Sequence, residues 1–408
     1  MKIGILTYHA ACNFGANLQV LSTVEYLKNA GHDPYVIDWY SEELEKFYRA
    51  STPEQQYNCH VEYRKMYLPL TKRCFNEKDV ANVIDEMGIE AVIVGSDAVA
   101  QHHPLKSRRK FAPRLMKFTV YEPTKDRMFP NCFWGSFVQY LKHPIPLAMM
   151  SGSSQNSDYK LMTEDEQIAI NKSTENFKYI STRDTWTSNM FSYITQGRVI
   201  PPVTPDPVFA FNYNVNNQPT KNAILKKYNL PERYYLVSFH NSRTVSKEWL
   251  TELKDKAKAI DIECVALAFP QGMEFEHPFN LSIDIPLSPM DWYCLIKYSE
   301  GYIGHNMHPI VVSLHNAVPC YSFDNYGVVK YRYFVNDKSS KIYHILSVFG
   351  LLGNRSASVG KKVFVPTVDY VLEKLKSYNR EHVSFVANGY LEKYKTMMSD
   401  MLNALTKK

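Results

Sequence analysis

The sequence predicts an α/β protein built of two halves. Short apolar runs of strand length alternate with segments that carry apolar residues at helical spacing, and this alternation occurs twice along the chain. A proline-rich stretch, 198–211, separates the two series. We expect one domain at 1–211 and a second at 212–366, followed by C-terminal helices at 367–408 that pack on the outside or cross back to the first half.

The first half begins with a predicted βαβ unit. Residues 2–8 and 34–40 have the length and apolar content of buried strands, and residues 17–31 between them have leucine and valine at helical spacing. This order predicts a right-handed crossover over a parallel sheet. Further helices are expected at 78–88, 165–177 and 185–194, and further strands at 90–95, 145–154, 178–184 and, briefly, within 198–211.

The second half repeats the pattern. Strands are expected at 234–240, 262–269, 301–304 and 318–323, and helices at 220–229, 246–260, 288–300 and 308–317. Ser288 and Asp291 fit the start of a capped helix. Two further helices are expected at 367–379 and 381–405.

Composition favours a globular protein in a reducing compartment. The chain has 408 residues, of which 45% are hydrophobic, enough for large cores. Its seven cysteines are scattered without zinc-binding spacing, which indicates free thiols and no metal site. The N-terminus lacks the features of a secretory signal and no apolar run could span a bilayer, so we expect a cytoplasmic protein.

A basic cluster at 105–117 has six basic residues in thirteen, while the whole chain has a net charge of +6. It is consistent with a solvated loop or helix face. It is equally consistent with contact to an anionic lipid headgroup at the inner face of the membrane, a diphosphate-linked substrate or an acidic partner. No basic stripe with a recognisable binding motif accompanies it, so nucleic acid is not an expected partner.

Candidate site residues follow from the predicted strand ends, because ligands of open α/β sheets bind outside the carboxyl ends of the strands. Each candidate residue can also be explained by structure alone. The explanations are turn formation, helix capping, an ion pair of Arg183 with Asp184 or Asp206, or a histidine that is buried with its hydrogen bonds satisfied. The residues at these positions are Asn13, Gly15, Ser96, Asp97, Ser151 to Ser154, Arg183, Asp184, His240, Asn241, Asn306, Met307 and His308.

Several common catalytic motifs are missing from the sequence. It has no glycine-rich phosphate loop of either common type, no G-x-S-x-G nucleophile elbow and no H-E-x-x-H helix. Nucleotide hydrolysis, dinucleotide redox chemistry and serine hydrolysis are therefore disfavoured.

Five blocks in order resemble the polysaccharide pyruvyl transferase family. The first block is the most specific, because Tyr8, Asn13, Phe14, Gly15, Ala16, Leu18, Gln19, Gly31 and His32 match the family's opening turn and helix. The others are 93-IVGSDAV-99, 147-LAMMSGSS-154, 180-ISTRDTWTSNMF-191 with 205-PDPVF-209, and the segment 291–323. The chain departs from the pattern at Asn306, where an Arg or Ser is common, and at 98-AVA-100, which lacks the family's Gln and Trp.

The resemblance implies two Rossmann-like domains of the glycosyltransferase-B type with a cleft between them. It also implies transfer of the pyruvyl group of phosphoenolpyruvate to two hydroxyls of a sugar, forming a pyruvate ketal in exopolysaccharide or capsule biosynthesis. No cofactor or metal is expected. The basic cluster makes a lipid-diphosphate-linked acceptor and peripheral membrane contact conceivable.

On this interpretation, Arg183 clamps the donor with help from Ser153 and Ser154. His308 serves as general acid or base, and Asp97 as a partner base that stabilises a cationic intermediate. Of the other histidines in the segment 291–323, His315 is expected to be structural, and the role of His305 is undecided. The remaining expected substrate contacts are Asn13, Gly15, Ser96, His240 and Asn306.

Two alternatives remain open at this point. A glycosyltransferase of the same fold would bind a nucleotide sugar and not phosphoenolpyruvate. A non-catalytic protein of envelope polysaccharide assembly would have a cleft in which no cationic residues converge.

Overall fold

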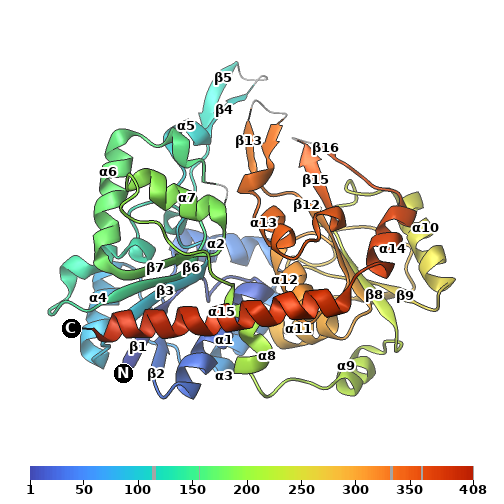
Figure 1. Cartoon of the computed structure of the whole chain (residues 1–408), viewed down its shortest axis with the longest axis horizontal. Coiled ribbons are helices and arrows are strands. Elements are labelled where there is room, and N and C mark those ends of the chain that lie inside the picture. Colours follow the sequence, from blue (N-terminus) through green and yellow to red (C-terminus); the bar gives the residue numbers. More distant parts are fainter. Residues whose placement is uncertain (113–115, 156, 331–333, 360–361, 408) are drawn as a thin grey trace.

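The first half of the chain contains a parallel sheet with the strand order β2-β1-β3-β6-β7 (Figure 1). The computed structural model describes residues 1–112, 116–155, 157–330, 334–359 and 362–407. The strands are β1 (Lys2–Leu6), β2 (Asp33–Val36), β3 (Ala91–Asp97), β6 (Leu147–Gly152) and β7 (Phe177–Thr182). Helices cover both faces, so residues such as Ile5 and Ile93 are fully buried and the strands form continuous apolar runs in the sequence.

A second sheet forms the other half, with the strand order β10-β9-β8-β11-β12-β15-β16. It is parallel except for the last strand, which pairs antiparallel with its neighbour. The strands are β8 (Tyr234–Ser238), β9 (Glu263–Leu267), β10 (Leu281–Ile283), β11 (Gly301–Gly304), β12 (Cys320–Asp324), β15 (Arg355–Val359) and β16 (Lys362–Val363). The predicted fold class, two Rossmann-like α/β halves, is confirmed.

Helices surround both sheets, and most begin at a capping side chain. Asn13 accepts a hydrogen bond from the Ala16 amide at the start of α1. Ser288 accepts one from the Asp291 amide at the start of α11, as predicted. The helices of the first half are α1 (Phe14–Asn29), α2 (Glu42–Ser51), α3 (Glu54–Tyr67), α4 (Glu77–Met87), α5 (Leu105–Arg108), α6 (Glu164–Ser173), α7 (Thr185–Ile194) and α8 (Phe211–Asn214). Those that follow are α9 (Lys221–Tyr228), α10 (Lys247–Lys258), α11 (Pro289–Lys297), α12 (Met307–His315), α13 (Lys341–Val348), α14 (Val368–Lys376) and α15 (Arg380–Thr406).

The last helix, α15, joins the two halves. It runs from the second half across to the first, where it contacts β6 and β7, and its end lies near the N-terminus of the chain (Figure 1). Met397, Met398 and Met401 on this helix are buried in a hydrophobic core that continues into α1, α11 and α12. The two halves therefore share a core and do not meet only through a linker.

The connector at 198–211 corrects one prediction. No strand forms there; Val203 makes a single bridge to Thr182, and a 3-10 turn at Pro207–Ala210 follows. Prolines at 201, 202, 205 and 207 lack the backbone N–H that a sheet ladder needs, which explains why the segment stays irregular.

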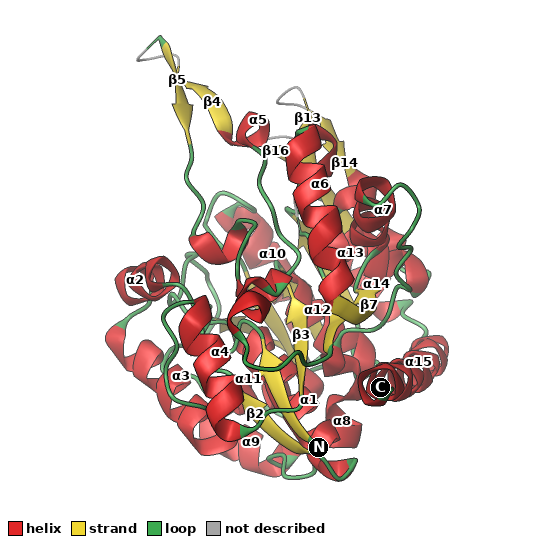
Figure 2. Cartoon of the chain, turned by 90° about the vertical axis from the view of Figure 1, so that its left-hand side faces the viewer, coloured by secondary structure: helices red, strands yellow, loops and turns green. Residues whose placement is uncertain are grey.

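Other elements were not predicted. Helices α2 and α3 lie between the second predicted strand and the third, and two small antiparallel hairpins extend from the body of the protein (Figure 2). One hairpin is formed by β4 (Arg109–Ala112) and β5 (Lys117–Val120), the other by β13 (Val328–Lys330) and β14 (Phe334–Asn336). The predicted basic cluster falls mainly on α5 and the first hairpin, and its residues 113–115 lie outside the described part of the chain.

None of the helices in the described ranges is long and apolar enough to cross a membrane. All seven cysteines are free, as predicted.

Candidate active site

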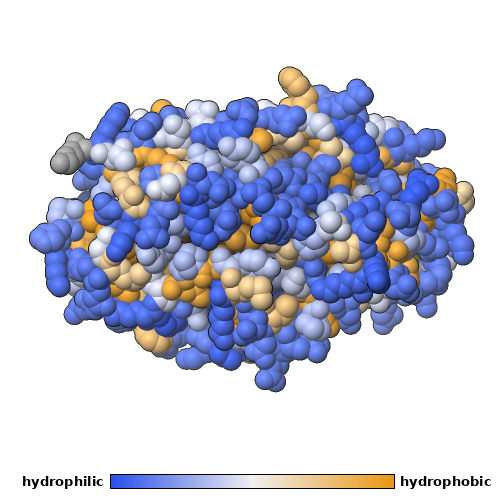
Figure 3. All heavy atoms as spheres, turned by 90° about the horizontal axis from the view of Figure 1, so that it is seen from below, coloured by the Kyte–Doolittle hydropathy of each residue, from blue (hydrophilic) through white to orange (hydrophobic). Residues whose placement is uncertain are grey.

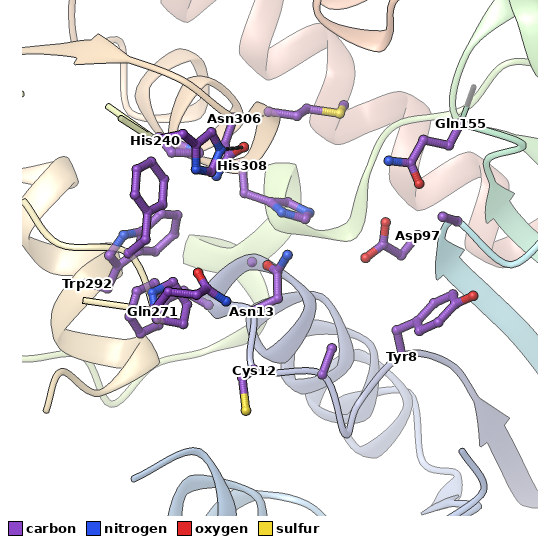
Figure 4. Close-up of a pocket in the computed structure, with 18 of the residues that line it drawn as sticks. Tyr8, Cys12, Asn13, Asp97, Gln155, His240, Gln271, Trp292, Asn306 and His308 are labelled. Carbon is purple, nitrogen blue, oxygen red and sulfur yellow. Dashed lines mark hydrogen bonds between the residues drawn. The ribbon is translucent and has the colours of Figure 1, made fainter. Parts of the chain in front are cut away.

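A cavity of about 280 Å³ lies between the two halves of the protein. Its walls come from the loop before α1, the end of β3 and the loops after the first hairpin on one side, and from the ends of β8, β9 and β11 on the other. Figure 4 shows Asn13, Asp97, Gln155, Asn306 and His308 arranged around this space. Of the predicted site residues, those that line the cavity are Asn13, Gly15, Asp97, His240, Asn306, Met307 and His308.

The halves approach each other closely at Gly15, in the first turn of α1. The His308 ring from the other half lies so close that a Cβ on Gly15 would be 1.9 Å from the His308 Cγ. Only glycine leaves room for the ring, which explains why a glycine follows the capping Asn13 and Phe14. The contact also brings the N-terminal ends of α1 and α12 to the same cavity.

Arg183 lies behind the cavity wall and holds two carboxylates. Its guanidinium donates to Asp206 Oδ2 at 2.9 Å and to Asp97 Oδ1 at 3.2 Å, and its side chain is only 1% exposed. An ion pair with Asp206 was one of the structural explanations given for Arg183 from the sequence, and it is confirmed. Because Arg183 does not line the cavity and two of its nitrogens are already engaged, the expected role of a direct donor clamp does not fit its position.

Asp97 is the last residue of β3, has a positive φ of 73° and lines the cavity. Burial by itself would raise the pKa of its carboxyl group, but the positive charges of Arg183 and Lys341 outweigh burial and lower it. Asp97 is therefore an ionised carboxylate that faces the cavity.

His308 offers an unpartnered ring nitrogen. Its Nε2 is buried without a hydrogen-bond partner among the described residues and lies 4.0 Å from Asp206 Oδ2. Burial lowers the pKa of His308 to about 4, although Asp206 and Asp97 act in the opposite direction. The imidazole is thus neutral near pH 7 and is suited to accept a proton, with Asp206 near enough to stabilise the resulting cation.

Two cationic side chains line the cavity, and neither was predicted. Lys341 begins α13 and is buried, yet no carboxylate oxygen of the described residues lies within 4 Å of its Nζ. Burial lowers its pKa to about 8, and the charge of Arg183 acts in the same direction. Arg127 also lines the cavity; its Nε has no hydrogen-bond partner in the part of the chain that the structure describes and lies 3.9 Å from Asp126 Oδ2.

Asn306 precedes α12 in a strained conformation, with φ 75° and ψ 153°. Its side chain does not cap the helix. Its Oδ1 instead accepts hydrogen bonds from His240 Nε2 at 2.9 Å and from the Tyr326 hydroxyl at 3.3 Å (Figure 4). These bonds fix His240, whose other ring nitrogen contacts Glu274 and whose backbone amide donates to His305. His305 is therefore part of the support for His240.

An aromatic wall closes the side of the cavity that belongs mainly to the second half. Phe14 stacks on Trp292 with ring centroids 5.3 Å apart, and His240 stacks on Phe269 at 4.1 Å. Flat aromatic faces of this kind pack well against the apolar face of a sugar ring. The cavity thus has a polar, charged end near Asp97, Arg127 and Lys341, and an aromatic end near Trp292 and Phe269.

Three predicted serines do not reach the cavity. Ser96 donates to the Ser151 carbonyl, Ser153 donates to Asp184 at 2.8 Å, and Ser154 bonds to the Thr187 hydroxyl. All three are buried and hold β3, β6 and the start of α7 together. His315, expected to be structural, packs against Phe209 and Tyr293 away from the cavity.

Among the residues that the structure describes, no group of three or more His, Cys, Asp or Glu side chains could hold a metal ion.

Solved structures with a similar arrangement of two sheets include nucleotide-sugar enzymes. The UDP-GlcNAc 2-epimerase of Neisseria meningitidis, solved with UDP-GlcNAc bound, has 9% sequence identity and a TM-score of 0.52, covering 99% of this chain and 100% of that one. The UDP-GlcNAc 2-epimerase of Methanocaldococcus jannaschii has 10% identity and a TM-score of 0.50, covering 95% and 99%. This protein therefore has the glycosyltransferase-B type of fold, with its cavity in the cleft between the halves.

The chain belongs to the polysaccharide pyruvyl transferase family, whose model matches residues 13–326. The predicted resemblance is confirmed, and the match contains most of the cavity wall. No curated protein matches the sequence.

We predict that Gly15→Ala disrupts the contact between the halves. The added methyl group would overlap the His308 ring, and overpacking of this kind costs roughly 1–3 kcal/mol. Urea unfolding should therefore show a lower free energy of unfolding for this variant. The matched control is Gly389→Ala on α15, where a Cβ would meet nothing within 4 Å and stability should change by at most about 1 kcal/mol, in the stabilising direction. Equal stability of Gly15→Ala and the native protein would contradict the contact.

Proposed function

We propose that this protein transfers the pyruvyl group of phosphoenolpyruvate to two hydroxyls of a sugar, forming a cyclic pyruvate ketal and releasing phosphate. The observation that carries the proposal is Lys341, a buried ammonium group that faces the cavity without a carboxylate of the described residues within 4 Å. A buried charge in this situation is stabilised by an anionic ligand. Family membership supplies the reaction type, and the cavity supplies groups that suit it.

The donor carries a phosphate and a carboxylate, and the polar end of the cavity offers matching groups. Lys341 and Arg127 supply positive charge, and the N-terminal turns of α1 and α12 both lie at the cavity wall. The chain has Asn306 where an Arg is common in the family, so in this proposal Lys341 and Arg127 take over the cationic role. Arg183 acts one layer further out, by holding Asp97 and Asp206 in place.

His308 starts the reaction as a base in this proposal. Its neutral Nε2 takes the proton of the first sugar hydroxyl, whose oxygen bonds to the central carbon of phosphoenolpyruvate. The electron pair of the double bond takes up a proton at the methylene carbon, which becomes a methyl group; the imidazolium of His308 supplies this proton and returns to its neutral form. Asp206, 4.0 Å from Nε2, stabilises the imidazolium while His308 carries the proton.

Loss of phosphate completes the transfer. The bond between the central carbon and the phosphate oxygen breaks with its electron pair, which leaves an oxocarbenium-like carbon. The ionised Asp97 stabilises this positive charge. The second sugar hydroxyl then bonds to the same carbon, and its proton leaves with the phosphate. The reaction needs no cofactor or metal beyond the donor itself.

The acceptor sugar would lie at the aromatic end of the cavity, against Trp292 and Phe269. A sugar of an exopolysaccharide or capsule precursor, including one linked to a lipid diphosphate, fits this role. The two hydroxyls that receive the pyruvyl group would point toward His308 and Asp97.

Substitution of the two central residues should separate chemistry from donor binding. His308→Ala is expected to lower kcat for phosphate release by roughly 10²- to 10⁴-fold, because it removes the base. Lys341→Met is expected to raise KM for phosphoenolpyruvate by about 10- to 100-fold, because it removes a charge-assisted contact. The matched controls are the exposed residues His382→Ala and Lys338→Met, which should behave like the native protein.

The assay is phosphate release from phosphoenolpyruvate in the presence of candidate acceptor glycans. Native activity in both His308→Ala and Lys341→Met would contradict the proposal. Turnover of a nucleotide sugar in place of phosphoenolpyruvate would assign the cavity to the glycosyltransferase alternative.

The pH dependence should depend on Lys341. Its ammonium group must be protonated to attract the donor, and its pKa of about 8 means that it loses its charge as the pH rises through that value. The kcat/KM for phosphoenolpyruvate, which reports ionisations of the free protein, should therefore fall above about pH 8. Lys341→Arg keeps the charge at high pH and should remove this decline. An identical decline in the native and Lys341→Arg proteins would contradict the assignment.

A further inference from the structure

The first hairpin, β4–β5, exposes apolar side chains that no core covers. Met116 is 80% exposed, the highest fraction for any large hydrophobic residue in the described part of the chain, and Tyr121 is 53% exposed. Phe118 and Val120 on β5 are 69% and 42% exposed. Clustered exposure of large apolar side chains usually marks an interaction surface.

The same segment holds the charge asymmetry of the protein. Residues 105–121 contain six basic residues and no acidic one. Because the net charge of the whole chain is +6, basic and acidic residues are equal in number in the rest of the chain. Arg108 pairs with Glu122. Lys106 and Arg109 are exposed, and neither has a carboxylate within 4 Å among the described residues. Basic and apolar residues are thus interleaved on one projection.

Other projections reach the same end of the molecule. The hairpin β13–β14 and the end of β15–β16 lie at the top, with β4–β5, in both side views (Figures 1 and 2). They add Val329, Phe364 and Val365, with exposed fractions of 53%, 68% and 41%. The opposite face of the molecule is mainly hydrophilic, with scattered hydrophobic residues (Figure 3).

These hairpins are inserted in the sequence next to the cavity. The segment with β4–β5 lies between Gln101 and Arg127, and β13–β14 lies between Tyr326 and Lys341. All four of these flanking residues line the cavity. The hairpins therefore extend from segments that also line the cavity. A surface bound to the hairpins would lie on that side of the protein.

We propose that this end of the protein docks on an anionic lipid bilayer, with Met116 and Tyr121 entering the headgroup boundary while Lys106 and Arg109 contact lipid phosphates. Convex projections that carry basic and apolar residues match a flat, fluid anionic surface. A protein partner is a poorer match, because the cores of protein interfaces are depleted in lysine and this segment contains three lysines. The docking is independent of the donor and of the reaction.

Co-sedimentation of the full chain with lipid vesicles tests the proposal without any substrate. Vesicles with about 30% phosphatidylglycerol in phosphatidylcholine are compared with pure phosphatidylcholine, at about 0.1 M and about 1 M salt. The protein should bind the anionic vesicles at low salt and dissociate at high salt. Two double variants are tested: one combines Lys106→Glu with Arg109→Glu, and the other combines Met116→Ser with Tyr121→Ser. Each should reduce binding at least about 10-fold, with an unchanged unfolding midpoint.

Matched controls lie away from the hairpins. Lys178→Glu with Lys258→Glu reverses two exposed charges, and Phe385→Ser removes a phenyl group that is 77% exposed on α15. Both should bind vesicles like the native protein. The proposal is overturned if the native protein stays in the supernatant, binds both vesicle types equally, or loses binding as much in the controls as in the hairpin variants. Retention on dextran sulfate without vesicle binding would assign the surface to a soluble polyanion and also overturn it.

Discussion

The buried guanidinium of Arg183, held between Asp97 and Asp206, is the interaction on which the cavity depends. It connects the end of β7 to the end of β3 and to the proline-rich connector. None of the three charged groups could stay buried alone, because an unpaired charge in the protein interior is strongly destabilising. Together they place one carboxylate at the cavity wall and the other beside His308. The arginine thus determines the electrostatics of a cavity that it does not line.

The second constraint is the close contact between the halves at Gly15 and His308. Gly15 in the first half has no side chain, so the His308 ring from the second half can occupy the space. Asp206, from the connector, completes this contact, since it accepts a hydrogen bond from Gln19 on α1 and lies near the His308 ring. Three separate segments of the chain therefore fix the position of His308, and the ring is positioned before any ligand binds.

Much of the fold could be predicted from the sequence, because buried parallel strands and capped helices have local signatures. The apolar runs predicted most of the strands, and Ser288 marked the start of α11. Helices α2 and α3 and the small hairpins were not predicted. Helix α3 shows no clear apolar periodicity, whereas α2 has Leu44, Phe47 and Tyr48 at helical spacing and was missed. The connector was misread as partly strand, although its prolines exclude a regular ladder.

The site could be predicted only in part. His308, Asp97, Asn13 and Gly15 lie at the end of a strand or at the start of a helix, so position alone pointed to them. Arg183 also follows a strand, but its guanidinium turns inward to two carboxylates, which strand position cannot reveal. The sequence did contain one signal for this arrangement, since Asp206 lies within the block 205-PDPVF-209.

Lys341, at the start of α13, and Arg127, in the 3-10 turn Lys125–Arg127, each follow an inserted hairpin, where neither periodicity nor motif indicates a role. Only the three-dimensional structure brings them to the cavity.

The central claim is that the cavity between the halves holds a small anionic donor through Lys341. The most direct measurement is calorimetric titration of phosphoenolpyruvate into the native protein and into Lys341→Met, with a nucleotide sugar titrated in parallel. The account predicts saturable binding of phosphoenolpyruvate to the native protein, a large loss in the variant and no binding of the nucleotide sugar. Tight binding of the nucleotide sugar with no detectable binding of phosphoenolpyruvate would contradict it.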